Sequence, residues 1–162
     1  MSTNMTVYVS ALQDSLQKKL DVLKKLLDLT NEQGEILAGE SPDMERFDAI
    51  IEEKGHLLEN METLDRGFES FFAKIGNTLK TERYQYQTQI QEMQNLIRSI
   101  TDTGLQIEGQ EQRNKAAFES FLAGAKREIK ESRASNRTAT SYYQNMANQP
   151  KIGQSYFVDQ KK

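Results

Sequence analysis

The sequence contains no cysteine and no tryptophan, and only two prolines and one histidine among its 162 residues. Without cysteine the chain cannot carry a disulfide scaffold, a thiolate metal site or a cysteine nucleophile, so nothing in it requires an oxidising compartment. The single histidine, His56, confines any histidine-based catalytic triad to one position. The nine glycines are scattered along the chain and form no phosphate-binding loop. Several classes of enzyme are excluded by these absences.

One metal-binding spacing is present but incomplete. Glu53 and His56 follow the Glu-x-x-His step of di-iron helical bundles, and such a site requires two of these motifs. Because no second histidine exists, we interpret both as solvated or hydrogen-bonding residues of a helix. Carboxylates that could serve in acid–base catalysis, such as Glu52, Glu108 and Glu111, are interpreted as parts of solvated helix faces. The sequence therefore predicts no metal, no cofactor and no enzyme activity.

The chain also lacks a long hydrophobic run near its start. Charged and polar residues interrupt the leucines of the first helix throughout, and the mean hydropathy of the chain is -0.74. A signal peptide or a membrane span needs an unbroken apolar segment. We therefore expect a cytoplasmic protein that does not insert into membranes.

The net charge of -3 is unevenly distributed. From Lys126 onward eight bases face three acids, which gives +5, while the preceding residues hold 13 bases and 21 acids, which gives -8. Such a basic segment either complements the dipole at the end of a helix or serves in docking, and the sequence leaves both alternatives open. Nucleic acid is not expected as a partner, because the bases are sparse and the acidic body would repel phosphates.

Hydrophobic residues recur at helical spacing over most of the chain and predict three long helices. Leucines at positions 12, 16, 20, 23 and 27 define a first helix over residues 6–38. After it, Gly39 suits a left-handed C-terminal position, Ser41 the next N-cap and Pro42 the first helical turn. A second helix is expected over about residues 42–76, with a turn near Gly76 or several residues further on, and a third over about residues 79–135.

The third helix has the most regular seam, with hydrophobic residues at alternating steps of three and four. Gly104, Glu111 and Asn114 interrupt this seam, and a polar residue in such a position can fix the register of helix packing. At 1.5 Å per residue the third helix would be roughly 80 Å long, against roughly 50 Å for each of the others. The sequence therefore predicts an all-α, elongated antiparallel three-helix bundle or coiled coil with an overhanging third helix.

We expect the overhang to leave a hydrophobic stripe without an intramolecular partner, which usually marks a binding surface. The stripe comprises Phe118, Phe121, Leu122, Ala125 and Ile129. In this prediction residues 1–135 form the bundle and residues 136–162 form a flexible C-terminal tail. Aromatic residues in a segment without its own core are typical of recognition anchors, and the tail carries Tyr142, Tyr143, Met146, Tyr156 and Phe157.

Three segments of the C-terminal half carry a resemblance to a known family. They are ITDTGLQIEGQEQRNKAAFESFL (100–122), KREIKESRASNRTATSYYQNM (126–146) and SYFVDQKK (155–162), and residues 26–65 also fit. In these segments the chain is similar to the FlgN-type flagellar export chaperones, in the form found in clostridia and their relatives. The resemblance spans nearly the whole chain and rests on the order of the helices and on the aromatic tail.

The resemblance implies a cytosolic chaperone that binds hook-filament junction proteins (the hook-associated proteins), prevents their premature assembly and delivers them to the flagellar type III export apparatus. It also implies that the C-terminal part of the long helix and its extension bind the client, so that the stripe from Phe118 to Ile129 would face an amphipathic client helix. Tyr142, Tyr143 and Met146 are candidates for a client contact or an export-gate contact, and Tyr156 and Phe157 for secondary docking. The export ATPase and a second copy of the chain are further partners to consider.

Two alternatives to a chaperone stay open on the residues alone. In the first, the chain is a structural coiled-coil protein whose third helix pairs with its own copy in a homodimer. In the second, it is a metal-dependent helical-bundle enzyme, which would retain bound metal after purification.

Overall fold

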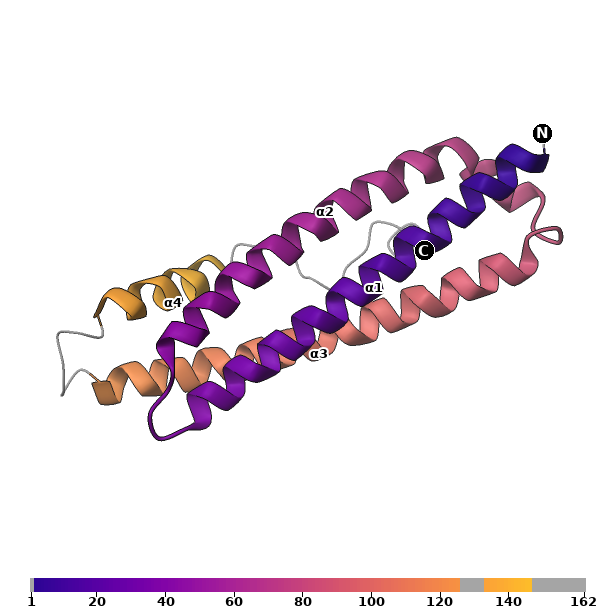
Figure 1. The fold of residues 1–162 in the computed structure, drawn as a ribbon. Helices are drawn as coiled ribbons and strands as arrows, with labels where there is room; N and C mark the ends of the chain where they lie inside the picture. The colour runs from indigo at the N-terminus through magenta and orange to yellow at the C-terminus, as the bar shows by residue number, and fades with distance from the viewer. Residues whose placement is uncertain (1, 126–132, 147–162) are drawn as a thin grey trace.

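The computed structural model describes residues 2–125 and 133–146, with the side chains of residues 4–124 and 137–146. These residues form four α-helices: α1 (Ser2–Ala38), α2 (Met44–Thr81), α3 (Gln87–Ala125) and α4 (Arg133–Met146). The three long helices alternate in direction, α1 packs against both α2 and α3, and α4 lies beside the N-terminal half of α2 (Figure 1). The predicted all-α helical bundle is confirmed.

In the turn between α1 and α2, the N-cap of the second helix is Asp43 rather than the expected Ser41. Asp43 is the N-cap of α2, and its carboxylate accepts a hydrogen bond of 3.1 Å from the backbone N–H of Arg46. Its carbonyl accepts the first intrahelical bond, from the N–H of Phe47 at 3.0 Å. Asp at this position also places a negative charge at the positive end of the helix dipole, which Ser41 could not do. No glycine among the described residues has a positive φ, so the left-handed Gly39 was wrong.

The second turn lies several residues further along the chain than Gly76, which the prediction of about 42–76 and 79–135 had allowed for. Helix α2 continues to Thr81, and the N–H of Glu82 then bonds to the carbonyl of Thr78 at 2.8 Å. The buried face of α2 explains why the helix continues past Gly76. Ile75 and Leu79 are both buried, and a helix that ended at Gly76 would expose Leu79 to water.

The shift of this turn makes the three long helices nearly equal, at 37, 38 and 39 residues. The C-terminal end of α3 runs past the turn between α1 and α2, but α4 lies beside it (Figure 1), and Phe118 contacts Phe47 of α2 and Tyr143 of α4. The overhanging part of α3 therefore has an intramolecular partner in α4, contrary to the prediction, and the expected extension over 126–132 lies outside the described residues. The expected tail was also wrong in part, since residues 136–146 belong to α4.

Most of the core lies between α1, the C-terminal half of α2 and the N-terminal half of α3. The regular seam predicted for the third helix is buried here, at Met93, Ile97, Ile100, Gly104 and Ile107. The partner of this seam is α1 of the same chain rather than a second copy. A coiled-coil pattern in the sequence thus forms the interior of a bundle built within one chain.

Residues 2–125 and 133–146 include neither a candidate membrane span nor a candidate metal site. No helix there combines the length and the hydrophobicity that crossing a membrane requires. No group of three or more histidine and carboxylate side chains gathers there as a set of metal ligands.

Replacing Leu23 with Ala should lower the free energy of unfolding by about 2–5 kcal/mol, because Leu23 is fully buried and a cavity would remain. Urea denaturation followed by circular dichroism measures this loss. The matched control is Leu105→Ala on α3, where the side chain is 59% exposed. The control should change stability by less than about 0.5 kcal/mol, and equal losses in the two variants would contradict the assignment of the core.

Candidate functional site

A second hydrophobic cluster lies at the end of the bundle that carries α4. Its buried members, here called the α4 cluster, are Leu37, Phe47, Phe118, Ala139 and Tyr143. The rings of Phe47 and Phe118 are stacked with centroids 6.2 Å apart, and Tyr143 lies 5.3 Å from Phe118 and 6.3 Å from Phe47. Because all four helices contribute, the cluster joins α4 to the three-helix bundle.

The structure brings together six of the predicted client-binding residues, but it does not leave them unpartnered. Phe118 and Tyr143 are only 2% and 4% exposed. Partly buried side chains surround them, and these are Phe121, Leu122, Tyr142 and Met146. Ala125 ends α3, and its side chain is not among those described, while Ile129, Tyr156 and Phe157 lie outside the described residues. The described part of the stripe is thus covered by the chain's own α4, which corrects the expectation of an exposed surface.

A layer of buried polar residues lies next to the α4 cluster. This polar layer consists of Thr30 and Gln33 from α1, Lys54 from α2, Glu111 and Asn114 from α3, and Tyr142 from α4. At its centre the ammonium group of Lys54, a residue only 1% exposed, forms an ion pair with Oε1 of Glu111. Lys54 also donates a hydrogen bond of 2.8 Å to Gln33 Oε1. One buried charge pair therefore connects the N-terminal half of α2 to the C-terminal half of α3.

Neighbouring side chains extend the layer to the backbone of α1. Thr30 donates its hydroxyl to the carbonyl of Leu26 at 2.6 Å and lies 3.3 Å from Glu111 Oε1. Asn114 donates its amide to the carbonyl of Thr30 at 2.8 Å. Side chains that bond across helices in a dry interior fix the level at which the helices meet, since a shift would leave buried polar groups unpaired.

Helix α4 enters the polar layer through one side chain, Tyr142. Its hydroxyl donates to Glu111 Oε1 at 2.8 Å, and the ammonium group of Lys54 lies 4.9 Å from the centre of its ring. A cation over an aromatic face is attracted by the ring quadrupole, and the attraction grows when water is excluded. Tyr142 thus contacts both members of the ion pair.

The electrostatics of the layer follow from its burial. Loss of solvation lowers the pKa of Lys54, and the charge of Glu111 offsets part of this effect. Burial raises the pKa of the Tyr142 phenol well above its usual range, and the negative charge of Glu111 raises it further. The pKa of Tyr143 is raised by the same two causes in the same order. Both phenols are therefore held in the neutral form.

Sequence reasoning missed Lys54. It gave Glu111 two interpretations, a solvated carboxylate and a polar residue in the seam of the third helix, and the burial of Glu111 agrees with the second. A signal was nevertheless present in the spacing. Phe47, Met61, Phe68 and Ile75 recur in steps of seven with one position left out, and that position is Lys54. A lysine in a buried string opposite an acid in a buried seam indicates an internal ion pair, because neither charge is stable alone in the core.

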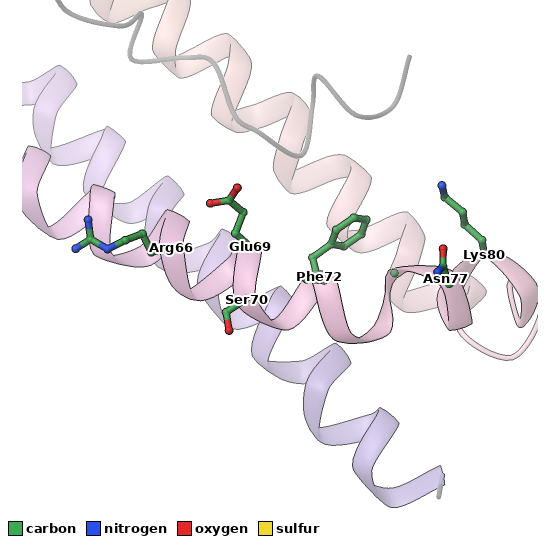
Figure 2. Close-up of a pocket in the computed structure, with 8 residues that line it drawn as sticks. Arg66, Glu69, Ser70, Phe72, Asn77 and Lys80 are labelled. Carbon is green, nitrogen blue, oxygen red and sulfur yellow. The ribbon is translucent and has the colours of Figure 1, made fainter.

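The other candidate chemistry of the sequence is not brought together. His56 is exposed, and Glu53 instead accepts a hydrogen bond of 3.1 Å from Arg46. A shallow pocket at the other end of α2 is lined by Arg66, Glu69, Ser70, Phe72, Ala73, Gly76, Asn77 and Lys80 (Figure 2). All eight residues belong to one helix, and the labelled side chains are spread along it rather than directed at a common point. This pocket lacks the convergent polar groups of a catalytic site.

Comparison with known proteins gives one match. The model of the family described as FlgN protein matches residues 1–151 of the chain, which includes all four helices. No match was found among curated proteins or among solved structures.

Replacing Lys54 with Met should lower the free energy of unfolding by about 3–5 kcal/mol, because the Glu111 carboxylate would be buried without its cation. The double variant Lys54→Met, Glu111→Leu removes both charges and should be more stable than the single Lys54 variant. Urea denaturation of the wild type and both variants measures these differences. A double variant less stable than the single one would contradict a coupled ion pair.

Because the hydroxyls of Tyr142 and Tyr143 are buried in the neutral form, the docking of α4 should weaken at high pH. Their pKa values are raised in the folded chain, so docked α4 is favoured fully below about pH 10, where a free phenol begins to ionise. Above that pH the released form loses protons and the docked form does not, so the stability from docking is lost as the pH rises. Phenolate absorbance of the native chain should show a late phase, above the pH at which a free phenol ionises, and this phase should be absent from the variant Tyr142→Phe, Tyr143→Phe and from denatured chain. Coincident titration in all three samples would contradict burial of these hydroxyls.

Proposed function

The chain belongs to the FlgN family, and within that family's general role in flagellar export as chaperones we propose that it binds hook-filament junction proteins, the hook-associated proteins. In this proposal the chain prevents their premature assembly and delivers them to the flagellar type III export apparatus. It acts in the cytoplasm by binding alone, without enzyme activity or a cofactor. The export gate or the export ATPase receives the loaded chaperone.

The observation that carries the proposal is the covering of the α4 cluster by a short helix. Phe118, Phe121 and Leu122 line one side of this surface on α3, and Phe47 lies opposite on α2. Helix α4 has 14 residues, a length at which an isolated helix is marginal in water. A surface that holds one amphipathic helix of its own chain has the shape and the polarity to hold the helix of a partner.

The client helix therefore takes the place of α4 in this proposal. Phe118, Phe121 and Leu122 contact the client, and Tyr142, Tyr143 and Met146 occupy the surface until the client arrives. The two groups of predicted site residues thus have complementary parts, one forming the surface and the other its cover. The exchange keeps the apolar surface out of water at every stage, which favours a reversible complex suited to delivery.

The structural coiled-coil alternative is disfavoured by the packing of α3. A homodimer built on the predicted seam would need Ile97, Ile100 and Ile107 on its surface, but all three are buried against helices of the same chain. Sedimentation of the purified chain tests the remaining surfaces for self-association.

Replacing Phe121 with Asp should weaken co-purification of hook-filament junction proteins with the chain by about tenfold or more, because a carboxylate would enter a dry helix-binding surface. Phe121 is chosen because it is only partly buried, so the fold should survive the change. The matched control is Leu105→Asp, an exposed position on the same helix outside the cluster. Undiminished client binding by the Phe121 variant would refute this surface as the client site.

A further inference from the structure

The contacts of α4 describe the helix that this surface accepts. Its buried face is formed by Ala139, Tyr142, Tyr143 and Met146, which follow one another at the three- and four-residue steps of a single helical face. Ala139 is 0% exposed, so a small residue is favoured at this fully buried position of the helix. Tyr143 and Met146 contribute apolar surface to the cluster.

Tyr142 differs from the other three, because it meets charges. Its hydroxyl donates to Glu111 Oε1, and its ring lies against the ammonium group of Lys54. A phenylalanine would keep the ring and lose the donor. A serine or threonine would carry a donor but could not extend from α4 to the carboxylate. Only an aromatic ring with a hydroxyl at its far end makes both contacts together.

Because Glu111 is buried, the hydrogen bond from Tyr142 has a large effect on how tightly a helix binds at this surface. Glu111 is buried, and its second oxygen, Oε2, has no hydrogen-bond partner among the described residues. A helix without a donor at this point would bury the carboxylate with still fewer partners, and hydrogen bonds to buried charged groups are among the strongest in proteins. The penalty falls on any occupant that lacks the donor, whatever its hydrophobic face.

Tyr143 provides an internal comparison. Its ring packs between Phe47 and Phe118, but its buried hydroxyl has no hydrogen-bond partner among the described residues. The two adjacent tyrosines thus differ in their hydroxyl groups: that of Tyr142 donates to Glu111, and that of Tyr143 makes no hydrogen bond within the described residues. A phenylalanine at the second position should be tolerated, or even preferred.

From these contacts we infer that the Lys54–Glu111 ion pair is the specificity determinant of the client surface and selects a partner helix that carries a tyrosine over it. The partner helix has the frame of α4: a small residue three positions before that tyrosine, and hydrophobic residues one and four positions after it. This inference rests on the proposed function, since it names the chemistry of the client that replaces α4.

The test uses the full chain with Ala139→Asp, which places a carboxylate in the most buried position of α4 and so releases that helix without changing α1, α2 or α3. The probes are three fluorescent peptides of residues 133–146: the natural sequence, one with Tyr142→Phe and one with Tyr143→Phe. Fluorescence anisotropy measures their dissociation constants. The Tyr142→Phe peptide should bind about 10- to 100-fold more weakly than the natural one, and the Tyr143→Phe peptide as tightly or more tightly.

A second variant of the full chain tests whether the ion pair causes the preference for tyrosine over phenylalanine at position 142 of the peptide. In the chain with Ala139→Asp and Glu111→Gln, the preference for Tyr142 over Phe should fall below about tenfold, because the acceptor is no longer charged. Equal binding of all three peptides to the chain with Ala139→Asp alone would overturn the specificity inference and leave the helix-binding surface standing. Failure of the natural peptide to bind at all would overturn both the surface and the inference.

An intramolecular measurement avoids dependence on the released variant. Since the chain has no cysteine, Ala139→Cys introduces a single thiol that reagents reach only when α4 opens. Adding Tyr142→Phe should raise the labelling rate about 10- to 100-fold, and adding Tyr143→Phe should not raise it. The exposed control Ser141→Cys should label at one rate in every background. Equal acceleration by both phenylalanine substitutions would show that α4 is held by its rings alone and would overturn the inference.

Discussion

The ion pair of Lys54 and Glu111 is the interaction on which the arrangement of the four helices depends. Two opposite charges without solvent are stable only while each retains the other and its hydrogen bonds, so α2 and α3 are held at one level along the bundle. Gln33 and Thr30 bring α1 to the same level, and Tyr142 brings α4. Apolar side chains alone would tolerate sliding by a turn, whereas this layer does not.

A role as a chaperone is consistent with a bundle whose hydrophobic surface is covered by a short helix of the same chain, α4. A chaperone for proteins that polymerise must offer an apolar surface to its client, yet an empty surface of that kind invites aggregation. In this chain α4 covers Phe118 and Phe47 with an aromatic face of its own. Under the proposed function, the client and α4 compete for this one surface, and the difference between their affinities sets the direction of exchange.

Periodicity was sufficient to predict the three long helices and the buried seam of α3, because both follow from burying one face of a helix. It placed the second turn only to within several residues, because the sequence signal of Gly76 was overridden by the burial of Leu79. It failed for α4, whose polar composition resembles a linker and whose helix depends on contacts with Phe47 and Phe118. Of the candidate site, the aromatic residues were predictable from composition. The spacing placed Lys54 in a buried string and Glu111 in a buried seam, but pairing these two residues with each other required knowing which faces of α2 and α3 meet.

The polar layer also divides the interior, with the main core on one side and the α4 cluster on the other. Hydrophobic burial is cooperative where side chains interlock, and a belt of directional bonds interrupts that continuity. The two ends of the bundle should therefore behave as separate units of native-state opening, the end with α4 exchanging its amide protons sooner than the longer end. Such a division would allow the end with α4 to bind and release a partner while the other end of the bundle stays folded.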